Sequence, residues 1–328
     1  MIRPLALALV FATPAAADVA SVITNNVLPD FATFDTVSAE MAAAAAVEDC
    51  SAENLRQHYN ATFDAWMAVQ HLRIGPTENG ALNIAFWPDE RGFTAKTLSA
   101  MIADTDPLIN DAEGFAASSI AGRGLFALEM LLFDDRFDRY DADSYTCALV
   151  QRVAADIARE AHAQATDWQD RYALIIQGQG DGEALPIVSD ADAFATLYSQ
   201  IVNSLEFTSD SRVGRPLADF ARPRPKRAEA WRSDRSLRNI VLAVDTAYAQ
   251  AVELMGAPLP ATAQAVAEFH EAADAISDPS FSDIADNSQS WLKLQILGQK
   301  VDGVKNAISN EIGSVMGISA GFNASDGD

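Results

Sequence analysis

The sequence predicts an all-α protein built of two antiparallel helical bundles. Apolar residues recur at spacings of three and four along almost every segment, which is the periodicity of helices with one buried face. No segment alternates apolar and polar residues between hairpin turns, as strands would. The clearest break is the Gly- and Pro-containing stretch at 178–186. We therefore expect an N-terminal bundle over residues 18–178 and a C-terminal bundle over residues 179–328.

Residues 1–17 are expected to be a secretory signal peptide rather than part of the fold. Arg3 supplies the positive start, residues 5–12 are a short apolar core, and small residues precede a cleavage site near Ala17 and Asp18. The apolar run is too short to cross a bilayer, and no later segment reaches about 18 unbroken apolar residues. The sequence predicts a periplasmic protein without a transmembrane segment.

The composition allows a large core and excludes some partners. Of the 328 residues, 49% are hydrophobic, and 23 Lys and Arg against 46 Asp and Glu give a net charge of −23. Such an acidic surface repels nucleic acid and anionic membranes, so we expect neither as a partner. The charge suits a protein that meets cations or neutral molecules.

The N-terminal bundle is expected to hold five helices, separated by short connections. They cover residues 19–47, 52–74, 94–102, 113–133 and 145–176. Ser51 is a suitable N-cap for the second, and Gly75-Pro76 ends it. Residues 79–92 are expected to be irregular, and residues 134–143 to form an acidic surface turn.

The C-terminal bundle is expected to hold four helices and one basic segment. The helices run from after Ser189 through Leu205, and over residues 237–255, 261–276 and 281–312. Residues 212–236 differ from the rest, because they contain eight Lys or Arg and three prolines in a strongly acidic chain.

The two cysteines, Cys50 and Cys147, are expected to be bonded to each other. An oxidising compartment favours a disulfide over the alternative of two buried free thiols. Closing a loop of this length would stabilise the fold by roughly 4 kcal/mol on the chain-entropy model.

One acid, Glu129, lies inside the most apolar helix. Two offset apolar faces surround it, formed by Leu125, Leu128, Leu131 and Leu132 and by Phe126, Met130 and Phe133. A helix apolar nearly all round is buried, and a buried charge is costly unless it is paired or protonated. Two interpretations remain open: a structural acid bonded to an arginine or a helix end, or a functional group in a site.

Arg232, Arg235 and Arg238 follow at three-residue intervals into the next helix, a spacing that directs them toward one side. Two roles remain equally open for this row. It could pair with Glu129 across the interface between the bundles. It could instead hold an anionic ligand, such as a carboxylate or an organic iron chelate, through forked hydrogen bonds.

Three further residues are candidate walls of the same site. They are Arg73, Trp66 and Trp87. The alternative is that the two tryptophans are core aromatics and that Arg73 caps a helix end.

Six stretches, in order along the chain, together carry a family resemblance. They are AWMAVQHLRIGP (65–76), IAFWPDERG (84–92), GRGLFALEMLLFD (122–134), CALVQRVAADIA (147–158), PKRAEAWRSDRSLRNI (225–240) and SAGFNASDGD (319–328). They resemble the imelysin-like family of exported bacterial proteins and span nearly the whole mature chain. The resemblance implies two helical bundles with a pocket between them, a periplasmic or surface location, and a role linked to iron uptake.

The family signature G-x-H-x-x-E matches this chain at Gly124, Phe126 and Glu129, with phenylalanine in place of histidine. Phenylalanine cannot ligate a metal, so Glu129 alone remains there as a candidate ligand for iron or another divalent metal. Some family members have been described as peptidases. No HExxH pair occurs here, so a metallopeptidase is the least favoured function.

The sequence therefore predicts a non-enzymatic binding protein that captures a small anionic or iron-containing ligand between the bundles. Glu129 and the three arginines at 232, 235 and 238 are its expected polar groups, and Phe126 an apolar wall. The alternative is an interaction module for an envelope protein.

Overall fold

The computed structural model describes residues 18–47, 50–179, 187 and 189–316. Within these ranges all regular elements are helical, apart from one isolated bridge between Asp219 and Arg222, which confirms the all-α class. The expected signal peptide, most of the 178–186 break and the C-terminal tail lie outside the described residues, so the bundle boundary stays a prediction. No helix in the described ranges is long and apolar enough to cross a membrane.

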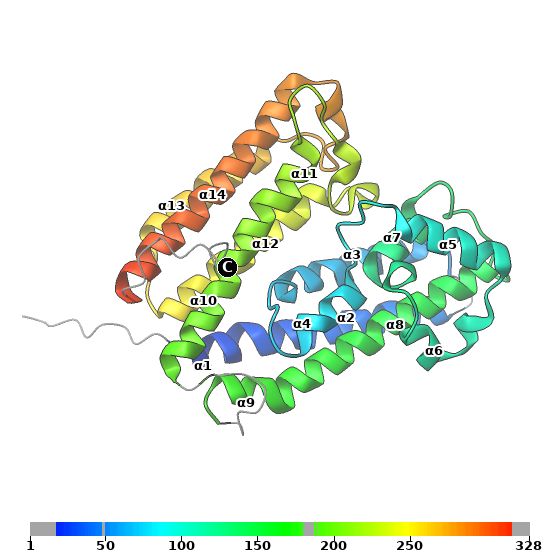
Figure 1. The fold of residues 1–328 in the computed structure, drawn as a ribbon, viewed down its shortest axis with the longest axis horizontal. Coiled ribbons are helices and arrows are strands. Elements are labelled where there is room, and N and C mark those ends of the chain that lie inside the picture. Colours follow the sequence, from blue (N-terminus) through cyan, green and yellow to red (C-terminus); the bar gives the residue numbers. More distant parts are fainter. Residues whose placement is uncertain (1–17, 48–49, 180–186, 188, 317–328) are drawn as a thin grey trace, which may run out of the picture.

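The N-terminal half packs around its first long helix. Its helices are α1 (Val19–Val22), α2 (Leu28–Ala46), α3 (Ala52–Val69), α4 (Pro76–Ile84), α5 (Phe93–Asp104), α6 (Ala112–Ala116), α7 (Gly124–Phe133), α8 (Tyr145–Asp167) and α9 (Ala173–Ile176). α2 packs along both α3 and α8 (Figure 1). Aromatic side chains pack along its apolar face; for example, Phe31 of α2 stacks on Trp168, with ring centroids 5.2 Å apart.

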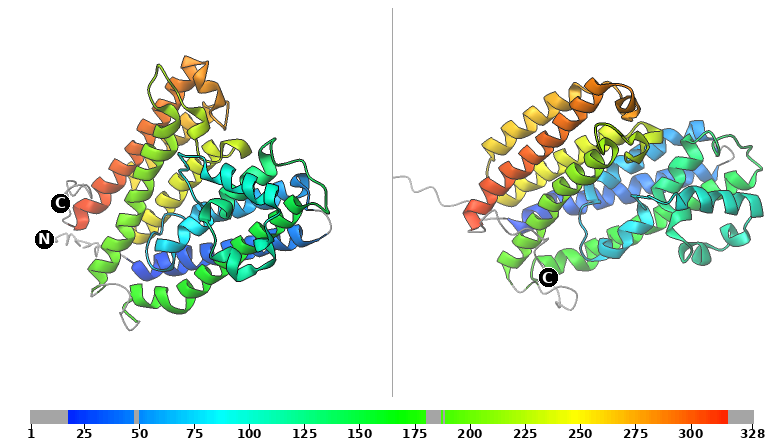
Figure 2. Two further views of the ribbon diagram at one scale, coloured as in Figure 1. Left: turned by 45° about the vertical axis from the view of Figure 1, so that its right-hand side comes forward. Right: turned by 45° about the horizontal axis from the view of Figure 1, so that its top comes forward.

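The C-terminal half is a second group of long helices beside the first. Its helices are α10 (Asp190–Phe207), α11 (Gly214–Leu217), α12 (Ser236–Met255), α13 (Pro260–Asp274) and α14 (Ser288–Met316). α13 packs on α14, and α10 packs on α12 (Figures 1 and 2). α12 also contacts α1 and α3, so it is the main element by which the two halves meet.

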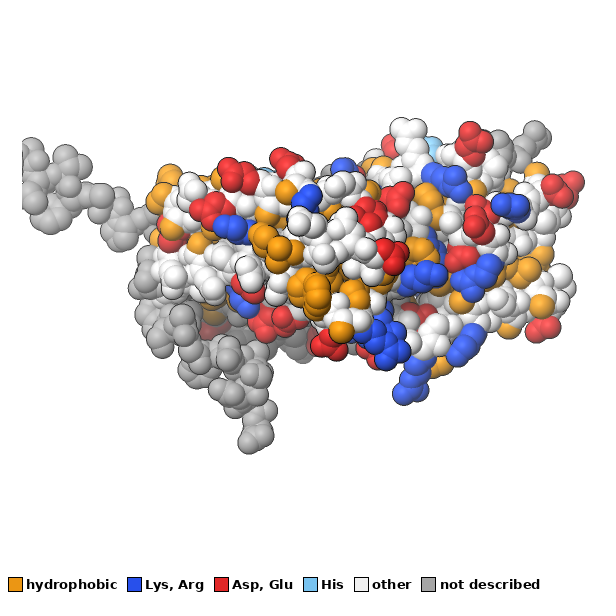
Figure 3. All heavy atoms as spheres, turned by 90° about the horizontal axis from the view of Figure 1, so that it is seen from above, with side chains coloured by type: hydrophobic (Ala, Val, Ile, Leu, Met, Phe, Trp, Pro, Cys, Tyr) orange, Lys and Arg blue, Asp and Glu red, His pale blue; other side chains and the backbone are white. Residues whose placement is uncertain are grey.

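The surface is acidic overall but not uniform. Seen from above, Lys and Arg side chains gather toward the right-hand side of the face, and hydrophobic side chains gather nearer its centre (Figure 3). Clustered cations in a chain of net charge −23 raise the local potential where they meet.

Two stretches of the N-terminal half differ from the sequence expectation. The helix expected to reach residue 74 ends at Val69, and α4, which ends at Ile84, occupies the first part of the expected irregular stretch 79–92. Pro76 stands at the start of α4, where its fixed φ suits a helix and its missing N–H costs nothing. The earlier helix ends seven residues before Pro76, so the proline begins α4 and does not end α3.

The expected helix over residues 113–133 is broken into two, α6 and α7. Between them Arg123 is extended, and Gly124 has φ +72°. A Cβ on Gly124 would lie 2.4 Å from the carbonyl oxygen of Ile84, which belongs to the backbone. Only glycine tolerates both the left-handed conformation and this approach.

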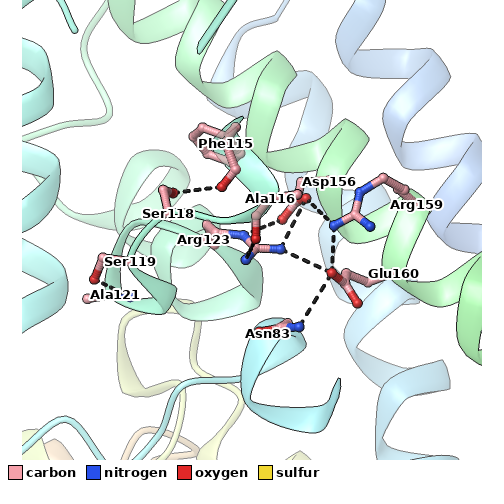
Figure 4. Close-up of polar contacts among 10 residues, drawn as sticks. All are labelled: Asn83, Phe115, Ala116, Ser118, Ser119, Ala121, Arg123, Asp156, Arg159 and Glu160. Atoms are coloured by element: carbon pink, nitrogen blue, oxygen red, sulfur yellow. Dashed lines mark hydrogen bonds and ion pairs between the residues drawn. The ribbon is translucent and has the colours of Figure 1, made fainter. Parts of the chain in front are cut away.

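Arg123 holds the loop that precedes α7 against helix α8. Its side chain is 2% exposed, and its Nε and Nη2 donate to the two carboxylate oxygens of Asp156 at 2.8 and 3.2 Å. Nη2 also reaches Glu160 at 3.1 Å, and Nη1 donates to the carbonyl of Ala116 (Figure 4). Forked, charge-assisted bonds offset the desolvation of this buried charge. The start of α7 is thereby held in place.

The disulfide between Cys50 and Cys147 is confirmed. The two Cα atoms lie 5.7 Å apart, and the residues are separated by 97 positions. The bond joins the segment before α3 to the first turn of α8, two helices that both pack on α2.

Replacing Gly124 by alanine should lower the free energy of unfolding by about 3 kcal/mol, because a positive φ and a backbone clash add together. Gly178→Ala is the matched control. Gly178 has φ +70° but open space around its Cα, so about 1 kcal/mol is expected there. Urea denaturation followed by circular dichroism measures both. If both variants lose the same free energy of unfolding, the close contact between residue 124 and the Ile84 carbonyl oxygen does not add to the cost.

Candidate ligand-binding site

A cavity of about 300 Å³ lies where the two halves of the chain meet near α7. One side comes from the aromatic loop and the start of α5, residues 86–95, and from α7. The other side comes from residues 215–232, within the basic segment. We refer to this space as the α7 cavity.

Aromatic rings form much of its wall. Trp87 and Phe126 lie nearly parallel, with ring centroids 6.4 Å apart, and Trp231 lines the opposite side. Phe63 of α3 meets the Phe126 ring edge-on at 5.7 Å and supports it from behind. The structure thus places Phe126 and Trp87, both predicted from the sequence, at one cavity.

Glu129 borders this cavity and is 1% exposed. One of its carboxylate oxygens accepts from the backbone N–H of Ser233 at 3.1 Å and from the Ser233 hydroxyl at 2.9 Å. Desolvation raises the pKa of Glu129, while the nearby Arg232 and the Ser233 bonds act in the opposite direction. Of the two roles that the sequence left open for the arginine row, an ion pair with Glu129 is not found among the described residues, where Glu129 bonds to Ser233.

Ser233 is the site residue that the sequence did not reveal. It ends a short 3-10 helix, Trp231–Ser233, which is enclosed by Ala230 at φ +47° and Asp234 at φ +55°. Non-glycine residues seldom adopt such angles, and helical periodicity carries no signal for them. This turn aims the Ser233 N–H and hydroxyl back at α7.

The three arginines do not form one row, which corrects the sequence prediction. Arg232 lines the α7 cavity and donates through Nε to Asp134 at 2.7 Å. Arg235 and Arg238 instead share Asp64 of α3 and are not among the cavity residues. The reason is the turn at Asp234, which separates Arg232 from the helix that carries the other two.

Four cationic side chains line the α7 cavity, and two of them are already paired. They are Arg215, Lys226, Arg227 and Arg232. Arg215 pairs with Glu90, as Arg232 does with Asp134. Lys226 and Arg227 are exposed and have no ion pair within the described ranges. The Lys226 Nζ lies 5.6 Å from the centre of the Trp231 ring.

The remaining predicted residues lie elsewhere. Trp66 is a buried core aromatic that packs against Phe34, with centroids 5.4 Å apart. Gly124 serves through its backbone conformation, as described above. Arg73 lines a different cavity, which shares only Trp87 with the first. Among the described residues, no group of three or more His, Cys, Asp or Glu is arranged to hold a metal, and the metal role of Glu129 stays a prediction.

Glu129 should make stability depend on pH in a characteristic direction. Its pKa in the folded protein lies above its ordinary 4.5, so the stability linked to this carboxyl is present at low pH and is lost as pH rises through the folded pKa. Glu129→Gln should therefore raise the free energy of unfolding, relative to wild type, at about pH 7.5 but not at about pH 4. Urea denaturation at both pH values measures this.

Asp134→Asn is the opposite-sign control. The hydrogen bonds of Arg136 hold the pKa of Asp134 well below its usual range, so this variant should lose stability mainly at neutral pH. An equal loss for Glu129→Gln at both pH values would contradict a desolvated Glu129.

The comparisons with known proteins agree on the fold. The family model described as imelysin (peptidase M75) matches residues 27–302. An imelysin-like protein from Psychrobacter arcticum has a TM-score of 0.72 at 19% identity, covering 93% of this chain and 96% of that chain. A protein described as an iron-regulated protein A precursor, from Parabacteroides distasonis, has a TM-score of 0.68 at 15% identity, with coverages of 91% and 97%. No curated protein matches. Because the family model covers most of the sequence, the chain belongs to the imelysin family.

Proposed function

We propose that this protein is a periplasmic binding protein, linked to iron, that captures a small anionic ligand in the α7 cavity. The observation that carries the proposal is the pair Lys226 and Arg227. These two cations stand at a cavity without an ion pair within the described ranges, in a chain of net charge −23. An anion is the complementary ligand.

The lining suggests what the ligand looks like. Guanidinium groups bind carboxylates through two parallel hydrogen bonds, and a lysine adds a point charge. Trp87, Phe126 and Trp231 supply flat apolar walls, and a space of about 300 Å³ suits a small molecule. Citrate and its iron(III) chelate carry this combination of carboxylates and compact size.

The link to iron rests on family likeness. One structural neighbour is described as an iron-regulated protein, and the chain belongs to the same fold family. We propose binding rather than peptide hydrolysis, because Phe126 occupies the position of the signature histidine and an aromatic hydrocarbon ring ligates no metal. An envelope protein partner stays a separate prediction.

Removing both free cations should weaken anion binding. In Lys226→Ala/Arg227→Ala, the affinity for citrate or iron(III) citrate should fall at least tenfold, since one charge-assisted hydrogen bond contributes about 1.5 kcal/mol or more. Isothermal titration calorimetry measures the affinity. The matched control is Lys300→Ala/Lys305→Ala, which removes the same charge from α14, away from the cavity.

Two results would count against this function. The first is a similar loss of affinity in the control, which would show that overall charge and not the cavity attracts the anion. The second is an absence of binding of either probe to the wild-type protein.

The lost histidine gives a test of the metal prediction. Phe126 and Glu129 lie three residues apart on α7 and both border the cavity, so Phe126→His should raise the affinity for Zn²⁺ by tenfold or more. Phe126→Asn, which is polar but has no imidazole, is the control. Equal Zn²⁺ affinities of the wild type and Phe126→His would contradict a metal-compatible geometry at α7.

A further inference from the structure

We propose that a second, separate cavity binds a small organic carboxylate that also carries hydrogen-bonding groups. This cavity measures about 540 Å³ and lies between the end of α3, α4 and the C-terminal part of α10. Among the described residues it shares only Trp87 with the α7 cavity, so the indole of Trp87 contributes to both. We call it the α10 cavity.

Buried polar side chains without partners line the α10 cavity. Gln70 is 4% exposed and Ser204 is 5% exposed. In the part of the chain that the structure describes, neither the Gln70 side-chain amide nor the Ser204 hydroxyl has a hydrogen-bond partner. The polar atoms of these two side chains are not among the fully buried atoms that lack a partner, so they keep accessible surface and can bond to a ligand in the cavity. The α10 cavity therefore offers an amide and a hydroxyl with free hydrogen-bonding capacity.

His71 adds a fixed, uncharged polar group. It is 5% exposed, and its Nε2 lies 2.7 Å from the Gln250 side-chain oxygen, which holds the ring in place. Burial lowers the pKa of His71 to about 4, so the imidazole is neutral near pH 7. Its other ring nitrogen completes a set of amide, hydroxyl and imidazole groups that suits a ligand with both donors and acceptors.

Arg73 determines the charge of the ligand. Its Nε donates to the carbonyl of Gln70 at 2.8 Å, and its backbone N–H donates to the Gln200 side chain at 2.8 Å, so the residue is anchored to both walls. Arg73 is exposed and pairs with no acid in the described ranges. Among the described residues, no Asp or Glu lines the α10 cavity. The terminal guanidinium nitrogens therefore favour a carboxylate.

The apolar wall is rigid. Trp87 meets Phe207 edge-on, with centroids 5.9 Å apart. Arg212 also packs on the Phe207 ring, with its guanidinium carbon 4.9 Å from the ring centre. The Nε of Arg212 in turn donates a hydrogen bond of 2.6 Å to the Glu229 carboxylate. A ligand with a flat apolar part can pack here without ordering the rings first. An N-acylated aromatic amino acid combines this part with an amide and a carboxylate.

The test uses N-acetyl-L-phenylalanine and its uncharged carboxamide as probes, with isothermal titration calorimetry on the full mature protein. The wild type should bind the carboxylate at least tenfold more tightly than the carboxamide, and Arg73→Gln should abolish this preference. Ser204→Ala and Gln70→Leu should each weaken binding several-fold. Lys226→Ala/Arg227→Ala should leave the affinity for this probe unchanged, which separates the test from that of the α7 cavity.

Arg73 is exposed, so Arg73→Gln should fold normally, and a thermal unfolding curve like that of the wild type verifies this. The proposal is overturned if the wild type binds neither probe or does not distinguish them. It is also overturned if Arg73→Gln retains the preference for the carboxylate. Loss of binding in the Lys226/Arg227 variant would place the probe in the α7 cavity instead and would equally overturn it.

Discussion

The position of α7 depends on a buried guanidinium and the glycine that follows it. Arg123 binds Asp156 and Glu160 of α8, which fixes the loop before α7. Gly124 then lets the chain pass against the Ile84 carbonyl. The next turn of this helix carries Phe126 and Glu129 to the cavity wall. These two residues thus help to set where α7 begins and which of its side chains reach the cavity.

Electrostatics distinguishes the two cavities that share Trp87. The α7 cavity is lined by aromatic rings, by the acids Asp89, Glu90 and Glu129, and by four cations, of which Lys226 and Arg227 remain unpaired within the described ranges. The described lining of the α10 cavity has one arginine, no acids, and the nearly buried polar residues Gln70 and Ser204. The first suits a compact polyanion, and the second suits a single carboxylate on a hydrogen-bonding body. Most other arginines of the described chain are neutralised by neighbouring acids, as Arg235 and Arg238 are by Asp64.

The sequence by itself determined the fold class, the disulfide, the family and the burial of Glu129. Each depends on a local or countable signal. Helical periodicity shows in the order of apolar residues, and two cysteines in an exported chain have few alternatives. An acid within an apolar helix is buried whatever its partner. Phe126 and Trp87 could be placed near the site because they belong to the family motifs, although Trp66, which belongs to one of them as well, lies in the core.

Tertiary structure decided which groups meet. Ser233 reaches Glu129 only because Ala230 and Asp234 adopt positive φ values, and these are imposed by packing rather than by residue type. The same turn separates Arg232 from Arg235, which a regular spacing had placed on one side. Gln70 and Ser204 look like ordinary polar helix residues in the sequence. Their place at one cavity exists only after folding, because α3 and α10 come together only in the assembled chain.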